Sequence, residues 1–165
     1  MAADLGLPEG RQTLVKDAFD SLGVVHTWVN NAGADVLTGS ASSMDFEGKL
    51  QRLLDVDVTG TILLSRAVAD RLVKQFDAKA NAFPASMVFI GWDQASEGME
   101  GDAGQMFGPV KAAVMAFANS LAQATGPRVR VNTIAPGWIR TSWGEETSDY
   151  WNQRAEGQSL MGRWG

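Results

Sequence analysis

Hydrophobic positions along the chain follow two kinds of spacing, one helical and one typical of buried strands. Residues 8–23, "PEGRQTLVKDAFDSLG", place Leu14, Ala18 and Leu22 four apart and end in Gly23, which predicts a helix with a glycine cap. Residues 24–33, "VVHTWVNNAG", are apolar and β-branched up to a polar, glycine-ended turn. This second pattern predicts a buried strand that leads into a loop.

The same alternation of helix and strand continues to the third strand. Helical spacing over residues 43–78 predicts two helices that meet near Asp57, and residues 86–91, "SMVFIG", predict a second strand. Residues 105–124 predict a helix with Pro109 in its first turn, and residues 128–137, "RVRVNTIAPG", a third strand. Strands that are buried on both faces and alternate with helices favour an α/β fold with a parallel sheet.

Composition narrows the class of protein. The 165 residues, 45% of them hydrophobic, suit one domain with one core. A net charge of −5 without a cluster of basic residues argues against nucleic acid as a partner. The chain has no cysteine, so disulfides, thiolate metal sites and a cysteine nucleophile are excluded, and we expect no metal. Without a signal-like N-terminus or an apolar run of ~18 residues, we expect a cytoplasmic protein outside the membrane.

Polar or glycine-bearing loops follow all three predicted strands. They are "NNAG", "GWDQ" and "NTIAPGWIRT", and in a parallel sheet the carboxyl ends of the strands share one edge, where ligands bind. Lys111 opens the helix that follows the second strand, so we expect it near the same cleft. The alternative is an ordinary solvated lysine in the first turn of a helix.

Three of these segments together resemble the short-chain dehydrogenase/reductase family. "VNNAG", a lysine on the helix after the next strand, and "VRVNTIAPGWIRT" occur in the family's order and spacing, and the 3-oxoacyl-[acyl-carrier-protein] reductase-like branch is the most similar. The resemblance runs from "ADL" to "LMGRWG". It implies a Rossmann-type, doubly wound sheet and hydride transfer between NAD or NADP and a carbonyl or alcohol. It also implies a homo-oligomer built through the helices that match residues 58–76 and 105–124.

The chain departs from the family pattern at both ends. The family's TGxxxGxG phosphate loop is absent, and "GMEGDAG" (98–104) follows the wrong strand and lacks the spacing. We therefore expect residues 1–165 to form a single incomplete domain of about three core strands, without the N-terminal nucleotide-binding βαβ unit and the last strand. The cofactor contacts that the resemblance implies fall on Asp4 and Leu5 for adenine, on Asn31, Ala32, Gly33 and Lys111 for ribose, and on Pro136, Gly137, Ile139 and Thr141 for nicotinamide and phosphates.

The catalytic positions are mostly replaced. In the family a YxxxK pair supplies the acid, because the lysine lowers the pKa of the tyrosine hydroxyl. Lys111 matches the lysine, but Phe107 stands at the tyrosine, Trp92 at the substrate-orienting serine, and Asp57 at an asparagine that holds a relay water. A small shift would bring Asp93 or Ser96 into use instead of the serine.

Two functions follow from these replacements. The first is an NAD(P)-dependent oxidoreductase that needs a nucleotide loop from a longer gene product and another acid. The second is a non-catalytic homologue that acts through binding or dimerisation.

Other aromatic and titratable residues lie outside the catalytic and cofactor positions. Trp138, Trp143 and Trp151 either form an apolar lid over a ligand or pack among themselves. Tyr150 would reach the cleft only through an unusual fold of its loop, and the lone histidine, His26, is expected to be structural.

Overall fold

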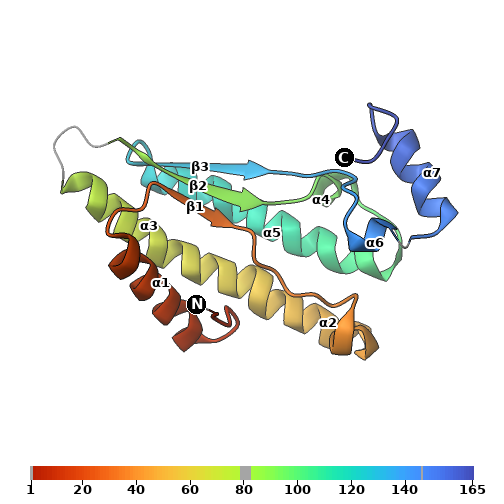
Figure 1. Ribbon diagram of the computed structural model, residues 1–165, viewed down its shortest axis with the longest axis horizontal. Coiled ribbons are helices and arrows are strands. Elements are labelled where there is room, and N and C mark those ends of the chain that lie inside the picture. Colours follow the sequence, from red (N-terminus) through yellow and green to blue (C-terminus); the bar gives the residue numbers. More distant parts are fainter. Residues whose placement is uncertain (1, 79–82, 146) are drawn as a thin grey trace.

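The computed structural model describes residues 2–78, 83–145 and 147–165, with the backbone alone for residues 142 and 143. The described chain is a three-stranded parallel sheet flanked by helices, which confirms the predicted α/β class (Figure 1). The elements in chain order are α1 (Pro8–Leu22), β1 (Thr27–Asn30), the 3-10 helix η1 (Gly39–Ser43), α2 (Phe46–Leu53), the π-helix η2 (Leu54–Gly60), α3 (Thr61–Asp77), β2 (Ala85–Ile90), α4 (Gln94–Glu97), α5 (Gly101–Thr125), β3 (Val129–Ile134), α6 (Ser142–Glu145) and α7 (Asp149–Gln158).

The sheet has the order β1-β2-β3, with every pair parallel. Helices α3 and α5 make the two crossovers, so the three carboxyl ends lie at one edge of the sheet. β1 begins later than predicted, because residues 24–26 precede it as a loop, and β2 is shifted by one residue from the predicted 86–91. Residues 31–33 and 135–137 lie in the loops after β1 and β3, as the loops predicted at the strand ends require.

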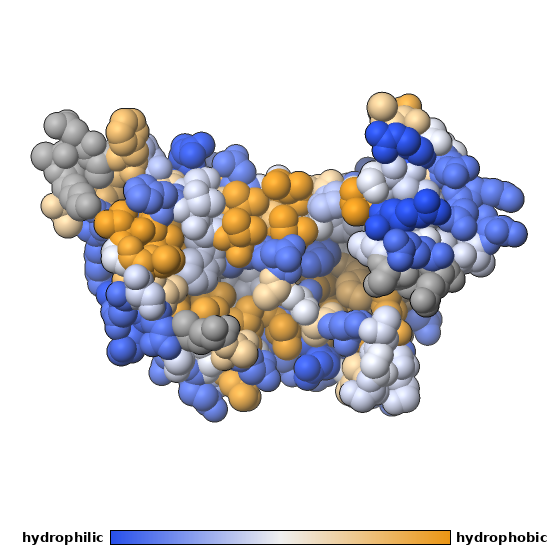
Figure 2. All heavy atoms as spheres, in the orientation of Figure 1, coloured by the Kyte–Doolittle hydropathy of each residue, from blue (hydrophilic) through white to orange (hydrophobic). Residues whose placement is uncertain are grey.

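Only one face of the sheet is covered, so the prediction of strands buried on both faces is wrong. Along β2, Met87 and Phe89 are fully buried, whereas Val88 and Ile90 are only partly buried. In register with them, Val29 of β1 and Ile134 of β3 are each 55% exposed. Helices α1, α3 and α5 lie on the covered side, and Figure 2 shows hydrophobic side chains exposed over the strands.

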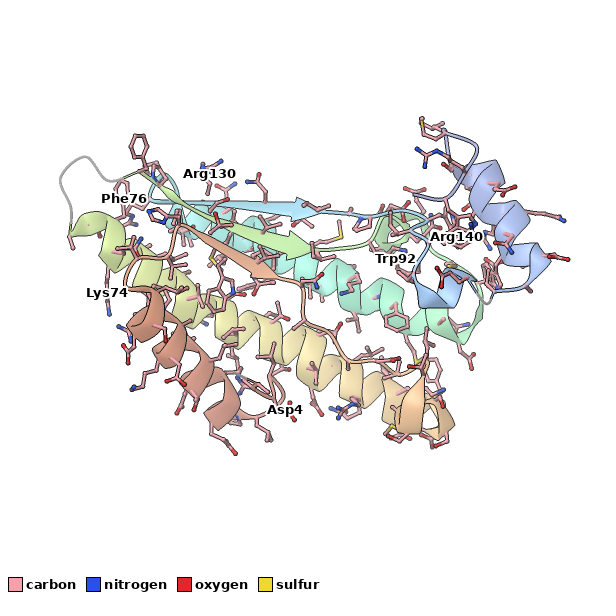
Figure 3. The ribbon with its side chains drawn as sticks, viewed as in Figure 1. Asp4, Lys74, Phe76, Trp92, Arg130 and Arg140 are labelled. Atoms are coloured by element: carbon pink, nitrogen blue, oxygen red, sulfur yellow. The ribbon has the colours of Figure 1, made fainter. Side chains whose placement is uncertain are left out.

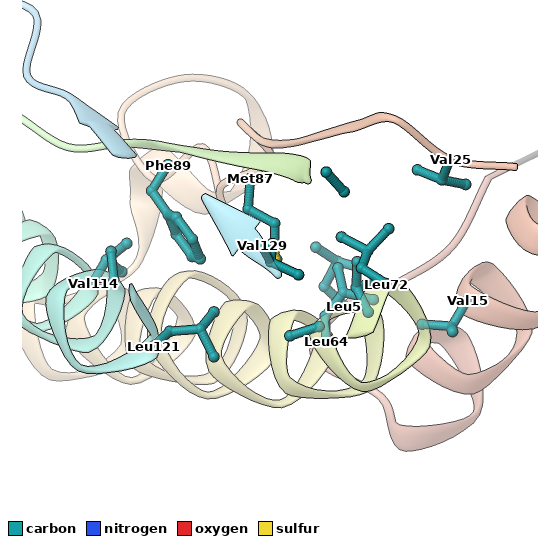
Figure 4. Close-up of a cluster of buried hydrophobic side chains, with 14 residues drawn as sticks. Leu5, Val15, Val25, Leu64, Leu72, Met87, Phe89, Val114, Leu121 and Val129 are labelled. Carbon is teal, nitrogen blue, oxygen red and sulfur yellow. The ribbon is translucent and has the colours of Figure 1, made fainter. Parts of the chain in front are cut away.

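The core fills the space between the covered face and the helices (Figure 4). Phe89 at its centre is fully buried and meets Phe117 of α5 edge to face, with ring centroids 6.0 Å apart. The apolar positions that recur along α3 and α5 also belong to this core: Leu64, Val68, Leu72, Val114 and Leu121, with Phe117 packed against them. These side chains therefore stabilise the single chain and are not free to form an interface.

Two helical predictions need correction in detail. The break expected near Asp57 exists, but it is the π-helix η2, which joins α2 to α3 without an intervening loop. Helix α5 begins at Gly101, so Pro109 and Lys111 lie well inside it and not in its first turn. The prediction from residues 105–124 missed the start because the glycines at 101 and 104 lower helix propensity. The helix predicted over 8–23 is confirmed, with Pro8 in its first turn and Gly23 at φ 68° after its end. None of the described helices combines the length and apolarity needed to cross a membrane.

Candidate active-site cavity

The loops after β2 and β3 are joined by backbone hydrogen bonds. The N–H of Gly91 donates to the carbonyl of Ile134 over 2.8 Å, and the N–H of Asp93 donates to the carbonyl of Pro136 over 3.2 Å. Gly91 is packed so closely that a Cβ there would lie 2.7 Å from the Met115 sulfur. These hydrogen bonds fix the two loops relative to each other, and the carbonyl of Pro136 already accepts one of them.

Lys111 is held by a buried carboxylate. Its Nζ lies 3.5 Å from Oδ2 of Asp57, whose side chain is 4% exposed while that of the lysine is 21% exposed. The other oxygen, Oδ1, accepts a 2.7 Å hydrogen bond from the N–H of Ala34, and Gly33 is so near that a Cβ would lie 2.8 Å from Oδ2. Asp57 therefore connects the loop after β1 to α5, and Lys111 is not an ordinary solvated lysine.

A cavity of about 320 Å³ lies beside this pair. Three of the predicted catalytic positions line it: Trp92, Phe107 and Lys111. The fourth, Asp57, is not in the lining but forms an ion pair with Lys111. From the predicted cofactor set, Gly137 and Ile139 line the same cavity. Segments that are distant in the sequence thus converge as the strand-end argument predicts, around a volume typical of small-molecule sites.

Other predicted residues lie outside the lining. Asn31, Ala32 and Gly33 form the loop after β1, and the exposed Thr141 precedes α6, where its carbonyl accepts from the N–H of Glu145 over 3.1 Å. Leu5 is 8% exposed and belongs to the core. The carboxylate of Asp4 accepts from the N–H of Gly6, and Figure 3 shows Asp4 far from Trp92. The cavity therefore unites only part of the predicted set.

Ser96, His26 and Asp93 also lie outside the lining. Ser96 is exposed and its hydroxyl contacts the carbonyl of Asp93, 3.4 Å away. His26 is exposed before β1, at the amino end of the sheet, where its carbonyl accepts from the N–H of Ser86. Asp93 comes closer, because its Oδ2 lies 2.8 Å from the point that a Cβ of Gly137 would occupy.

The C-terminal segment closes one side of the cavity. Trp138 and Trp164 line it, and their rings meet edge to face with centroids 5.6 Å apart. The N–H of Gly165 donates to the carbonyl of Trp138 over 2.8 Å, which holds Trp164 in place. Sequence reasoning did not find Trp164 or Met99 as lining residues, because neither stands in a motif and both reach the cavity only through the fold. The side chain of Trp143 lies outside the described part of the chain.

Helix α7 is attached to the start of α5 through Glu100. Arg154 forms an ion pair with this carboxylate, and the hydroxyl of Tyr150 donates to it over 2.7 Å. The guanidinium carbon of Arg154 also lies 6.0 Å from the ring centroid of Trp138 and 5.4 Å from that of Trp151. Tyr150 therefore helps to hold α7 at the start of α5 and is not among the residues that line the cavity. Glu100, Tyr150 and Arg154, called the Glu100 cluster below, are a second feature that sequence reasoning missed.

The Glu100 cluster makes the attachment of α7 sensitive to acid. The hydrogen bonds from Arg154 and Tyr150 lower the pKa of Glu100 from 4.5 to about 2. Because the folded pKa lies below the ordinary value, the stabilisation is complete above about pH 4.5 and is lost as the pH falls toward 2. We expect α7 to detach in this window, with a change in tryptophan emission as the readout. Glu100→Gln should remove that acid step, and identical acid titrations of the two proteins would contradict the role given to Glu100.

Comparison with known proteins identifies the family of the chain. The family model described as "Enoyl-(Acyl carrier protein) reductase" matches residues 1–165. The 3-oxoacyl-[acyl-carrier-protein] reductase FabG of Vibrio cholerae is 28% identical over 167 residues, which cover 100% of this chain and 64% of that protein. FabG of Aquifex aeolicus is 33% identical over 141 residues, which cover 83% of this chain and 51% of that protein.

A solved structure has the same arrangement of elements. The 3-oxoacyl-[acyl-carrier protein] reductase from Brucella melitensis, in complex with NAD, matches with a TM-score of 0.80 at 26% identity. The match covers 100% of this chain and 64% of that one. The chain therefore spans between half and two thirds of the length of these relatives.

Proposed function

The chain belongs to the short-chain dehydrogenase/reductase family, and from this premise we propose that its cavity binds a carbonyl or alcohol ligand in a protein of the NAD(P)-dependent oxidoreductase class. One observation carries the proposal. Lys111 lines the cavity together with Phe107 and Trp92, the positions at which the family resemblance locates the lysine, the acid and the orienting serine. That these three side chains share one cavity supports the proposal that it corresponds to a family active site with replaced side chains.

These side chains leave little for acid–base catalysis. Phenylalanine at position 107 has no proton to give, and Trp92 has no hydroxyl with which to orient a carbonyl. Among the described residues that line the cavity, Lys111 alone has a titratable side chain, and Asp57 pairs with it. Loss of a positioned general acid alone typically lowers a rate by ~10²–10⁴. We therefore propose that this chain transfers hydride slowly or not at all and acts mainly by binding.

A nicotinamide nucleotide would supply or accept the hydride. The chain offers candidate contacts to its nicotinamide half but not to its pyrophosphate. Lys111 offers an ammonium group to a ribose, and Gly137 and Ile139 offer backbone to a carboxamide. No TGxxxGxG motif is present for the pyrophosphate. The N-terminus of α2 is capped by its own Asp45, which accepts from the N–H of Gly48 and places a carboxylate where an anion would bind.

The test is a hydride-transfer assay together with cofactor titration. We expect NADH and NADPH to bind more weakly than micromolar, and reduction of a 3-oxoacyl thioester to be undetectable by absorbance of the nucleotide. Phe107→Tyr should fail to restore activity, because the new hydroxyl would have Lys111 beside it but no serine and a poorly held cofactor. Steady turnover by the unmodified chain would overturn the proposal of impaired catalysis, and micromolar binding would overturn the proposal of weak cofactor affinity.

A further inference from the structure

We propose that Trp164 is a displaceable plug: the C-terminal segment, residues 159–165, leaves the wall of the cavity and admits an apolar aromatic ligand into the place of the indole. The inference rests on the proposed function for the location of the site. It goes beyond that function by assigning a device that controls access to the cavity, whether or not hydride is transferred there.

The C-terminal segment is anchored by a single buried side chain. It contains no helix or strand, and Trp164 is its only buried residue, at 7% exposure. Leu160 is fully exposed and Met161 is 73% exposed, and the N–H of Gly162 closes a turn onto the carbonyl of Ser159 within the segment itself. In Figure 1 the segment leaves the end of α7 and returns to the carboxyl edge of the sheet. Its departure would therefore take one buried ring out of the protein.

Two backbone hydrogen bonds attach the end of the segment to the loop after β3. The N–H of Gly165 donates to the carbonyl of Trp138 over 2.8 Å, and the carbonyl of Gly165 accepts from the N–H of Arg140 over 3.2 Å. Because Gly165 and Arg140 are exposed, water can replace these partners when the segment leaves. The hydrogen bond from the Arg163 guanidinium to the carbonyl of Trp164 lies within the segment and moves with it. Hydrogen bonding therefore opposes opening only weakly.

The indole N–H of Trp164 favours opening. Its Nε1 is buried without an acceptor among the described residues, and burial of a donor without a hydrogen bond costs free energy. When the ring leaves the cavity, the same N–H donates to water. An aromatic hydrocarbon in the place of the indole has no such donor to bury, so the exchange of indole for ligand removes an unsatisfied group.

The other walls of the cavity suit a ring that replaces Trp164. Trp92, Phe107 and Trp138 line the cavity from the loops after β2 and β3 and from α5. The edge-to-face contact of Trp164 with Trp138, with centroids 5.6 Å apart, can pass to the ring of a ligand. With Trp164 in place the cavity measures about 320 Å³, near the lower end for small-molecule sites. Displacement of the indole therefore enlarges a space that is otherwise small.

Helix α7 does not have to move with the segment. The ion pair of Arg154 with Glu100 attaches α7 to the start of α5, and the indole of Trp138 donates to Oε1 of Gln158 over 3.0 Å. Neither contact involves residues 159–165. The C-terminal segment can therefore swing out from the end of α7 while the helix stays attached.

Fluorine NMR of the chain labelled with 5-fluorotryptophan tests the displacement directly. The probe is naphthalene, which has the fused-ring shape of an indole without its N–H, and no nicotinamide nucleotide is present. The signal of Trp164, assigned by its loss in Trp164→Phe, should move from a buried to a solvent-exposed position as naphthalene is added. The signal of Trp28 is the internal control and should stay in place, because Trp28 lies in β1, outside the lining, and its indole already donates to Asn30.

Calorimetric titration with naphthalene gives a second measurement. Minor open states of proteins are populated at about 0.1–10%, and the apparent affinity of a ligand for such a state falls by that fraction. Trp164→Ala, which removes the plug, should therefore bind naphthalene at least about tenfold more tightly than the unmodified chain. Leu160→Ala is the matched control, because it changes a fully exposed side chain of the same segment and should leave the affinity unchanged.

Three outcomes would each overturn the inference. They are a Trp164 signal that stays buried up to the solubility limit of naphthalene, a Trp28 signal that moves together with it, and a Trp164→Ala variant that binds no more tightly than the unmodified chain. The first two are read from the unmodified chain, so they decide the question even where the variant fails to fold. Hydride transfer is measured separately, with nicotinamide nucleotide and a 3-oxoacyl thioester, so a failure of the proposed function is distinguishable from a failure of the plug.

Discussion

Replacement of Phe89 by alanine is expected to lower the free energy of unfolding by about 3–5 kcal/mol. Phe89 lies on the central strand β2, is fully buried, and packs edge to face against Phe117 of α5. The change would remove the ring from the middle of the core and leave a cavity that the strands on either side cannot close. Domains of this size are stable by only about 5–15 kcal/mol, so the substitution would remove a large share of the stability.

Urea denaturation followed by circular dichroism measures this loss. Phe83→Ala is the matched control, because the same substitution is made where the ring is 91% exposed, and its effect should stay within about 0.5 kcal/mol. A loss of less than about 1 kcal/mol for Phe89→Ala would contradict the burial that gives Phe89 its central place.

The sequence predicted the elements where local patterns are strong. Gly23 predicted the end of α1 because a left-handed cap favours glycine, and the apolar run of residues 86–91 predicted β2. The same run could not reveal that one face is open. Val88 and Ile90 are as apolar as Met87 and Phe89, and only the fold shows that helices cover the second pair alone.

The candidate site was predictable to the extent that it depends on strand ends. Residues 91–93 and 135–138 follow parallel strands and therefore had to converge, and the resemblance located Lys111, Phe107 and Trp92. Glu100 and Arg154 meet across 54 positions of sequence, and no local spacing signals such a contact. The ion pair of Asp57 with Lys111 was missed for the same reason, although Asp57 itself was singled out.

The open face of the sheet bears on self-association, which we propose as a property of this chain. Val29, Val88, Ile90 and Ile134 lie on that face as neighbours in register, and the first and last are each 55% exposed. β1 is an edge strand, and its outer edge pairs with no other strand among the described residues. We propose that a second copy binds over this face, because exposed apolar faces and free strand edges are surfaces on which protein chains associate. The resemblance implies an interface through α3 and α5, but the main apolar faces of these helices pack in the chain's own core.

The chain is therefore expected to sediment as a dimer or larger at micromolar concentration, and the double variant Val29→Lys with Ile134→Lys to shift toward monomer. Two lysines on the open face would have to be desolvated in any pairing through it, whereas in the monomer both stay in water. Leu160→Lys with Met161→Lys is the control, since it adds the same charge at exposed apolar residues of the C-terminal segment and should leave the association unchanged. A stable monomer of the unmodified chain would refute self-association altogether. A dimer that survives the sheet variant would contradict the open face as its interface.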